Sequence, residues 1–333
     1  MNFLSAIIYM VLAFLLLYRL QYRRAESEDE YFQRFNSLRG LFAIEIVIGH
    51  VIRYDRTWLF PLGKFMLVSV AFFFFVSGWG LCRSFYYKKN YLTHFVQAKC
   101  GYLLLLSIYA FLLRCIVWIV TGSSEVKENL LVQYFQKTNW YIWELLFFYL
   151  LFYLVYKFIP CRLRNILIAV ITFICATVLF RIGALQGYYM SALAFPAGLL
   201  FHEYFDSVMS FLRGAAGKIA VLAAAGLGLT SAMSGADSLI GMVYLRNLLC
   251  LAVLGLMMFF LRYFCPGNIF LKFLGKYSTG IYIYQFTFLT MDKAAQAGWP
   301  LRMGLTLGLT LLTSVVMQPV HAWTRNKLGG GKD

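Results

Sequence analysis

Charged residues and prolines are scarce in this sequence. Asp, Glu, Lys and Arg together make up 13% of the 333 residues, and there are only six prolines. The hydrophobic fraction is 61% and the mean hydropathy is +0.71. A soluble protein cannot cover that much apolar surface with so few charges, so soluble globular, disordered, collagen-like and coiled-coil chains are excluded. The composition predicts an all-α polytopic membrane protein.

Acidic residues are the scarcer of the two charged classes. The chain has 14 Asp and Glu against 30 Lys and Arg, which gives a net charge of +16. In a soluble protein this excess would indicate nucleic-acid binding. In a membrane protein it indicates cytoplasmic loops and contact with anionic lipids, with an anionic substrate as a further interpretation. We therefore expect membrane lipids, and no nucleic acid, among the partners.

Paired cysteines and metal-ligand motifs are absent from the sequence. The seven cysteines form no CxxC pair and lie mostly inside or at the ends of apolar segments, so we expect small buried side chains rather than disulfides. The sequence contains no glycine-rich phosphate loop and no nucleophilic serine elbow. We expect no metal ion and no permanently bound cofactor, and the sequence does not indicate an oligomeric state.

Eleven segments of the chain are predicted to cross the membrane, because each holds about 15 to 25 predominantly apolar residues. The first segment has no basic residues before it and no small-residue cleavage site after it, so we expect an uncleaved anchor rather than a signal peptide. The predicted spans are 3–20, 38–54, 64–82, 100–120, 140–159, 165–180, 188–205, 218–233, 243–264, 277–291 and 303–320.

Lysines and arginines are unequally divided between the two sides of this arrangement. Alternate connections between the spans, together with the C-terminus, hold twenty of the 30 basic residues, and the opposite set holds eight. Because cytoplasmic loops carry the excess of basic residues, we expect the N-terminus outside and the C-terminus in the cytoplasm. The predicted location is a plasma membrane that the chain crosses many times.

The second predicted span contains an arginine and a histidine that share one helix face. Arg39 and His50 are eleven residues apart, which is about three helical turns plus 20° and about 16 Å along the axis. Arg39 is expected at the cytoplasmic mouth and His50 beyond the midplane. Either His50 serves a cavity, or it is a structural histidine bonded to a neighbouring helix. The other three histidines are predicted in or near cytoplasmic connections: His94, His202 and His321.

Basic residues also gather where the third predicted span reaches the cytoplasm. Arg83 ends this span, and Lys88, Lys89 and Lys99 follow it. Together with Arg39 they are suited to surround an anionic group such as a phosphate. The alternative is that they contact lipid headgroups and only set the topology.

Several other polar residues fall inside predicted spans. Glu45 lies about 140° around the helix from His50, so we expect it to pair with an arginine on another helix or to line a pore. Glu144 is predicted one turn into the membrane, where it can meet His50, Arg114 or a sugar hydroxyl. Buried arginine–glutamate pairs are the structural alternative for Glu144, Arg114 and Arg246.

Four segments, taken in order, resemble acyltransferase family 3, a family of integral membrane proteins. Arg39 and His50 in NSLRGLFAIEIVIGH form its R-x10-H pair, and FFFFVSGWGLCRSF is similar to its FF-x-x-SG-F pattern with a trailing arginine. NWYIWELLFFYLLF and LGKYSTGIYIYQF are similar to its later W-x-x-x-E and LG-x-x-S-x-x-I-Y segments. Lys99 stands at the first position of the family's basic RxxR cluster and Tyr102 at the second, and Gln285 stands where many members have a histidine.

The resemblance implies a fold and a reaction. The family has a ten-helix core, here preceded by one extra helix, so we expect an anchor and connector in residues 1–35, a membrane acyltransferase core in 36–322 and a cytoplasmic tail in 323–333. It implies transfer of an acyl group, usually acetyl, from cytoplasmic acyl-CoA such as acetyl-CoA to a carbohydrate hydroxyl. The expected acceptor is a surface polysaccharide or a lipid-linked glycan precursor, so the reaction is an O-acetylation in the cell envelope.

The resemblance also implies roles for individual residues. His50 and Glu144 are the expected catalytic residues, and Arg39, Arg83 and Lys99 the expected acyl-CoA contacts. His50 would act as a general base or would itself carry the acyl group, and the sequence does not separate these routes. The expected pore or acceptor contacts are Glu45, Arg114, Trp140, Arg246 and Ser278.

Two other functions explain part of the same pattern. A transporter or flippase for an anionic lipid-linked glycan would also need a basic mouth and polar residues inside the membrane. A non-catalytic scaffold or sensor would use the polar pairs for packing alone. Neither requires an arginine and a histidine on one helix face, and we therefore favour the enzyme.

Overall fold

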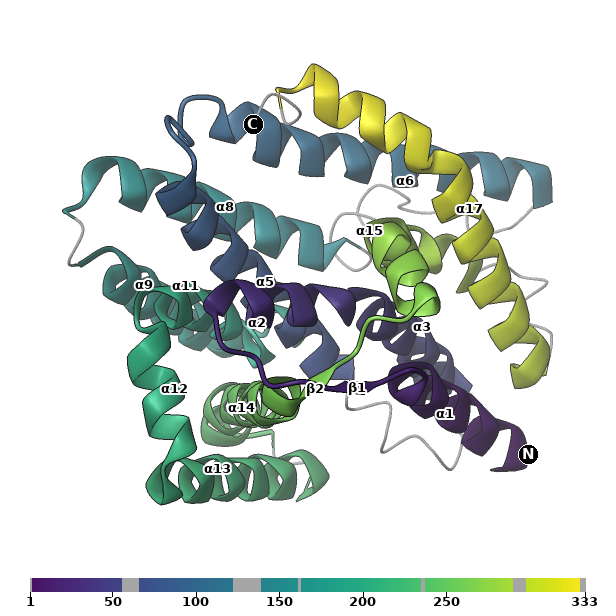
Figure 1. The fold of residues 1–333 in the computed structure, drawn as a ribbon. Helices are drawn as coiled ribbons and strands as arrows, with labels where there is room; N and C mark the ends of the chain where they lie inside the picture. Colours follow the sequence, from purple (N-terminus) through teal and green to yellow (C-terminus); the bar gives the residue numbers. More distant parts are fainter. Residues whose placement is uncertain are drawn as a thin grey trace.

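A computed structural model describes residues 2–55, 66–121, 139–160, 163–234, 237–289 and 298–329. Helices dominate this part of the chain, which confirms the all-α prediction (Figure 1). The long helices are α1 (Asn2–Leu17), α2 (Glu28–Ser37), α3 (Arg39–Asp55), α5 (Met66–Tyr87), α6 (Tyr102–Thr121), α8 (Trp140–Phe158), α9 (Arg164–Arg181), α11 (Ala194–Glu203), α12 (Phe205–Arg213), α13 (Ala215–Ser234), α14 (Arg246–Tyr263), α15 (Ile269–Leu289) and α17 (Trp299–Lys327). The shorter elements are β1 (Gln21–Tyr22), the π-helical turns η1 (Val96–Gly101) and η5 (Ile240–Leu245), α10 (Gly187–Met190) and β2 (Phe264–Cys265).

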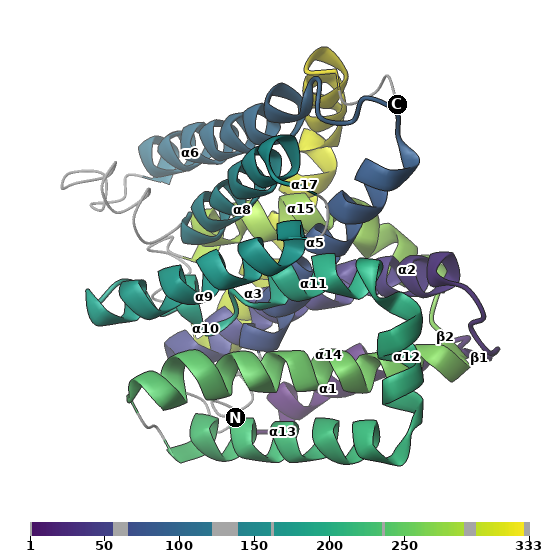
Figure 2. The same ribbon diagram turned by 90° about the vertical axis from the view of Figure 1, so that its left-hand side faces the viewer.

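Seven helical stretches within the described residues are long and apolar enough to cross a membrane, or eight if α12 and α13 form one bent span. They coincide with seven of the eleven predicted spans. The predicted span 188–205 is broken into α10 and α11, and α12 meets α13 at 87° (Figure 2). The chain is therefore a multi-pass helical membrane protein, and the number eleven stays a prediction. The remaining predicted spans outside the seven are 3–20, 218–233 and 277–291.

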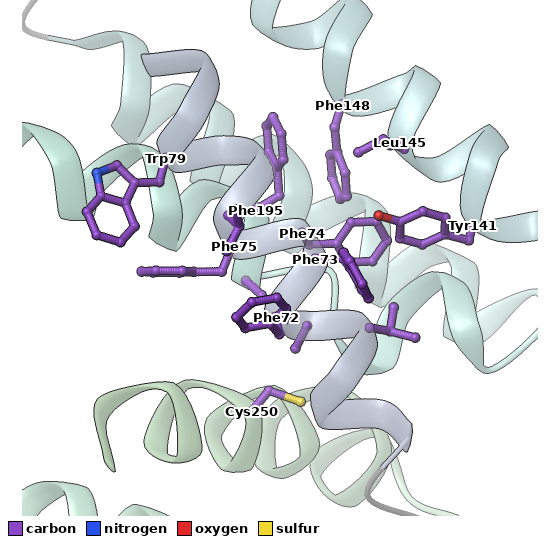
Figure 3. Close-up of a cluster of buried hydrophobic side chains, with 14 of the residues drawn as sticks. Phe72, Phe73, Phe74, Phe75, Trp79, Tyr141, Leu145, Phe148, Phe195 and Cys250 are labelled. Atoms are coloured by element: carbon purple, nitrogen blue, oxygen red, sulfur yellow. The ribbon is translucent and has the colours of Figure 1, made fainter. Parts of the chain in front are cut away.

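The phenylalanine run 72–75 forms the core of the molecule. Phe72 and Phe74 on α5 are completely buried, and Figure 3 shows the aromatic side chains of α5 surrounded by those of α8 and α11. The ring of Phe74 stacks on Tyr141 at 4.9 Å between centroids. The ring of Phe148 on α8 stacks on Phe195 on α11 at 4.5 Å. Burying large aromatic rings from three helices is the main source of packing energy here.

Two glycines let α5 and α11 approach each other closely. A Cβ atom on Gly78 would lie 2.2 Å from the carbonyl oxygen of Phe195, and one on Gly198 would lie 2.1 Å from that of Phe75. Small residues at facing positions allow membrane helices to pack backbone against backbone. The SGWG segment of the sequence is therefore a packing motif.

The connector after α1 is fixed to the end of α14. Residues 21 and 22 of β1 pair antiparallel with residues 265 and 264 of β2. The buried guanidinium of Arg34 donates from Nη1 to the carbonyl oxygens of Arg23, at 2.6 Å, and Leu261, at 2.8 Å. The bond to Leu261 satisfies a carbonyl group in the last turn of α14, where a helix has no partners of its own, and the bond to Arg23 holds the connector beside it.

Contacts between connections agree with the predicted alternation of sides. Arg83, after the core of α5, pairs with Asp29 in α2 at 2.7 Å between Nη2 and Oδ1. Trp140, at the start of α8, contacts Tyr188 in α10 with ring centroids 5.9 Å apart. The first contact joins two connections, and the second joins the starts of two predicted spans; in each case the sequence assigns both partners to the same side of the membrane. The structure does not say which side is cytoplasmic.

Candidate active site

A cavity of about 330 Å³ lies among α3, α5, η1, α8, α15 and the end of α17. We call it the Arg39 cavity. Its volume falls within the usual range for small-molecule sites, about 300–1,000 Å³. Three of the residues expected from the sequence, Arg39, Lys99 and Ser278, line it together. The complete lining is Arg39, Phe73, Ser77, Ala98, Lys99, Tyr102, Leu103, Tyr141, Ile142, Leu145, Tyr149, Ser278, Thr279, Tyr282, Ile283 and Arg325.

Arg39 is the first residue of α3 and is half-buried. The next residue explains its position, because a Cβ atom on Gly40 would lie 2.3 Å from Leu274 Cβ, so the start of α3 lies directly against α15. Among the described residues, the Arg39 guanidinium makes one weak hydrogen bond, from Nη1 to Asn36 Oδ1 at 3.5 Å, and has no carboxylate partner. A guanidinium held in this way is suited to bind an anion.

Two further cations from distant parts of the chain reach the Arg39 cavity. Lys99 is in η1, and Arg325 is near the end of α17, where its guanidinium lies over the ring of Tyr102 and donates to its hydroxyl at 3.3 Å. Among the described residues, the lining contains no Asp or Glu. Three cations without an acid in one cavity attract an anionic ligand.

A second basic cavity adjoins the first. It has a volume of about 450 Å³, and we call it the Lys88 cavity. It shares Ala98 and Lys99 with the Arg39 cavity and adds Lys88 and Lys327 at its wall. The two cavities are therefore both basic, and they meet at η1. His94 and the end of the chain after α17, up to Gly329, also line the second cavity.

Aromatic side chains line another part of the Arg39 cavity. Tyr141 on α8 and Tyr282 on α15 are in contact, with ring centroids 4.5 Å apart, and Phe73 on α5 lies next to Tyr282. Ser278 is one turn before Tyr282, is buried, and donates its hydroxyl to the carbonyl oxygen of Gly275 at 2.9 Å. The cavity thus combines cations with an apolar, aromatic wall.

His50 lies on α3, as predicted, about 16 Å along the helix from Arg39. It does not line the Arg39 or the Lys88 cavity. Its half-buried imidazole packs edge-on against Phe286 of α15, with ring centroids 4.7 Å apart. Phe286 is one turn beyond Tyr282, so the Phe286–His50 contact lies one helical turn further along α15 than the aromatic wall.

Glu144 and Trp140 lie away from the basic cavities. Glu144 is buried one turn after Tyr141 on α8, about 60° further around the helix, and lines a separate apolar cavity between α8 and α9. Among the described residues Glu144 is not paired with an arginine, so the predicted ion pair with Arg114 does not form. Trp140 packs against Tyr188 and against Gly187, where an added Cβ would lie 2.7 Å from the indole.

Arg83 lies outside both basic cavities. Its guanidinium pairs with Asp29 and lies over the rings of Phe32 and Tyr87, each 5.0 Å from the centroid. The ion pair is partly exposed to solvent and contributes little to stability by itself. The predicted role of Arg83 in acyl-CoA binding stays a prediction.

The other polar residues predicted in the membrane are also distributed along the helices. Glu45 accepts a hydrogen bond from the hydroxyl of Ser69 on α5, and among the described residues it is not paired with an arginine. Arg114 is buried on α6 with its guanidinium over Trp118, 4.4 Å from the ring centroid. Arg246 is the half-buried first residue of α14. None of these three lines the Arg39 cavity.

Sequence reasoning missed two features near the site. The sequence predicted that Arg325 and Lys327 only set the topology. Their spacing of four and six residues from His321 was the one indication that the three residues share a helix. His321 itself was expected near a cytoplasmic end, yet it is 2% exposed, and its Nε2 lies 2.7 Å from the hydroxyl of Tyr284. His50 is therefore not the only imidazole between helices.

Comparison with known proteins identifies the family. A model of the acyltransferase domain of acyltransferase family 3 matches residues 32–318. The match begins inside α2 and ends inside α17, so it includes the Arg39 cavity except for Arg325 at the end of α17, and it leaves α1 outside. No curated protein and no solved structure matches the chain significantly. Because the family model covers most of the chain, the protein belongs to acyltransferase family 3 and is a membrane acyltransferase.

Proposed function

We propose that this protein transfers an acyl group, acetyl in the first instance, from cytoplasmic acyl-CoA to a hydroxyl of a cell-surface carbohydrate or its lipid-linked precursor. One observation carries the proposal. Arg39, Lys99 and Arg325, from three separate elements, line one acid-free cavity that adjoins a second basic cavity. Family membership supplies the reaction class, and the cavity pair supports a phosphate-rich donor.

The two cavities suit the two ends of coenzyme A. Its phosphates are multiply charged and need several cations outside the hydrocarbon region. Lys88, Lys99 and Lys327 supply these in the Lys88 cavity. The pantetheine arm is long and only weakly polar, which suits the wall formed by Tyr141 and Tyr282. In this arrangement Arg39 and Arg325 bind the donor where its phosphates join the pantetheine arm.

The chemical step is assigned to His50. The neutral imidazole takes the proton from the acceptor hydroxyl, the oxygen attacks the thioester carbonyl, and the carbon–sulfur bond breaks. The leaving thiolate of coenzyme A then takes up a proton from the imidazolium, so that neither charge nor atoms are left over. To reach His50 from the cavity, the thioester would move along α15 from Tyr282, which lines the cavity, towards Phe286, which contacts the imidazole. Glu144 does not line this cavity, and its predicted catalytic role stays a prediction.

The test uses purified protein and acetyl-CoA labelled in the acetyl group, with release of free coenzyme A and transfer of label to glycan acceptors as readouts. We expect His50→Ala to lower transfer about 10²- to 10⁴-fold and to retain acetyl-CoA binding. Arg39→Ala is expected to weaken acetyl-CoA binding instead. Lys272→Ala is the matched control, because Lys272 is an exposed cation on α15 that lines neither basic cavity. Absence of both donor binding and coenzyme A release in the wild type would overturn the proposal.

The same material separates the two routes for His50. If the imidazole carries the acyl group, rapid acid quenching should trap labelled protein, and the label should be missing in His50→Ala. If transfer is direct, initial-rate kinetics should show that donor and acceptor bind together before either product leaves. Trapped labelled protein is compatible only with an acyl group carried by His50, and joint binding of donor and acceptor is compatible only with direct transfer.

A further inference from the structure

The cavity beside Glu144 is a second pocket, which we call the Glu144 cavity. It has a volume of about 380 Å³ and lies between α8 and α9, which are neighbours in the fold (Figure 2). Both helices are among the stretches that can cross a membrane. Its outer wall includes Ile174 and Val178, which are 54% and 50% exposed. In a membrane such side chains face lipid, so the Glu144 cavity is accessible sideways to the surrounding lipid chains.

Beside the aromatic Trp143 and Tyr188, two further polar side chains line this largely apolar pocket, Glu144 and Thr172. Glu144 is 5% exposed and Thr172 is 1% exposed, and both line the cavity. Among the residues that the structure describes, Glu144 Oε2 and Thr172 Oγ1 are buried without a hydrogen-bond partner. A buried polar atom without a partner costs about 1–3 kcal/mol, so the site is suited to a ligand that supplies both bonds.

The chemistry of the pair restricts the head group of that ligand. In the part of the chain that the structure describes, no Lys or Arg lines the Glu144 cavity, so a phosphate or carboxylate head would face Glu144 without a compensating cation from these residues. A hydroxyl provides one donor for the carboxyl oxygen of Glu144 and one acceptor for the hydroxyl of Thr172. The apolar remainder of the cavity, lined by Phe147, Phe148 and Leu179, suits a hydrocarbon chain.

We propose that the Glu144 cavity binds one apolar chain of a membrane lipid that ends in an uncharged hydroxyl group. The hydroxyl donates to Glu144 and accepts from Thr172, and the chain lies between α8 and α9. This site is distinct from the Arg39 cavity, because no described residue lines both cavities. Lipid binding here does not depend on the proposed acyl transfer, and its test does not measure that reaction.

The experiment uses the full chain in phosphatidylcholine nanodiscs and three photoreactive probes that share one alkyl chain and differ in the head group: hydroxyl, ammonium or sulfonate. Crosslinked peptides are identified by mass spectrometry. We expect the hydroxyl probe to label residues 143–148 and 172–179 most strongly. Unlabelled long-chain alcohol should compete for this labelling, and an alkane of equal length should not.

Variants of α9 provide the matched comparison. Thr172→Val keeps the shape and removes the hydroxyl, so it should lower labelling by the hydroxyl probe about three- to tenfold. Thr177→Val on the same helix should label as the wild type does, because Thr177 does not line the cavity and bonds to the carbonyl oxygen of Phe173. Glu144→Gln keeps an acceptor and should retain most of the labelling.

Three results would contradict the proposal. The first is equal labelling of wild type and Thr172→Val in protein of equal thermal stability. The second is labelling by the ammonium probe that matches or exceeds that of the hydroxyl probe, which would assign the site to cationic lipids. The third is competition by the alkane in wild-type protein, which needs no variant to fold and would show that no head group is recognised.

Discussion

Arg39 and Arg325 line the same cavity, although Arg39 begins α3 and Arg325 lies near the end of α17, almost 290 residues further along the chain. α15 joins them, because α3 and α17 both pack on it (Figure 1). The C-terminal helix is thus part of the site. Arg325 thus adds a cation to the cavity, and it lies outside the sequence motifs of the family.

Arg325→Ala should weaken the binding of acyl-CoA. The variant removes one of three cations from the Arg39 cavity, and a charge-assisted bond contributes about 1.5–3 kcal/mol. We expect KM for acetyl-CoA to rise about tenfold with little change in kcat. Steady-state kinetics at saturating acceptor measure both constants. A fall in kcat at unchanged KM would instead place Arg325 in the chemical step, and Lys272→Ala provides the baseline for loss of an unrelated cation.

Lys327→Ala should remove discrimination between donors that differ in phosphate content. Lys88, Lys99 and Lys327 line the Lys88 cavity, where the proposal puts the phosphates of coenzyme A. The wild type should bind acetyl-CoA more tightly than its 3′-dephospho form, and the variant should bind the two more equally. Isothermal titration with both donors and both proteins forms a double-mutant cycle. Additive losses in that cycle would contradict contact between Lys327 and the 3′-phosphate.

Local patterns predicted the parts of this site, and packing determined how they combine. Arg39 and His50 do share one helix, because an apolar segment inside a membrane forms a helix to satisfy its own backbone hydrogen bonds. The rotation of α8 was not predictable, because apolar and aromatic residues occur all around it and Glu144 does not by itself show which neighbour it faces. That rotation turns Tyr141 towards Arg39 and Glu144 towards α9.

The helices were predicted better than their breaks. Hydropathy located α5, α6, α8 and α9 closely, because long apolar runs determine spans. It did not indicate that residues 188–205 divide between α10 and α11. That break follows from packing, where the backbone of α11 lies against α5 and the amide of Leu193 donates to the side chain of Asn247.

Gly198→Ala should destabilise the protein through the contact between α5 and α11. The new methyl group would lie 2.1 Å from the carbonyl oxygen of Phe75, and overpacking of this kind costs about 1–3 kcal/mol. Gly226→Ala on α13 is the matched control, because no atom lies within 4 Å of its Cβ position. It should stabilise the helix by about 0.5–1 kcal/mol. Thermal unfolding in detergent should therefore give shifts of Tm with opposite signs, and shifts of the same sign would contradict the close approach.

Arg34→Met should destabilise the connector between α1 and α2. Methionine fills part of the volume but donates nothing to the carbonyl oxygens of Arg23 and Leu261. Loss of charged hydrogen bonds predicts a decrease of about 1.5–3 kcal/mol in the free energy of unfolding. Limited proteolysis should then cut first between residues 19 and 27. Lys218→Met, at a position without such bonds, should behave as the wild type, and equal protease resistance of the two variants would contradict the role of Arg34.

The half-buried imidazole of His50 and the buried imidazole of His321 should separate into one that acts in the reaction and one that stabilises the fold. His321 is bonded to Tyr284 between α15 and α17, one turn before Arg325. Removing that bond with Tyr284→Phe leaves a buried nitrogen without its partner and should cost about 1–3 kcal/mol, with transfer per folded molecule retained. His50→Ala should lose transfer while Tm changes little, because His50 is only half-buried. Coenzyme A release normalised to folded protein, measured beside Tm for both variants, tests this division. Loss of transfer in a fully folded Tyr284→Phe variant would move the catalytic imidazole from His50 to His321, which lies nearer to the cations that hold the donor.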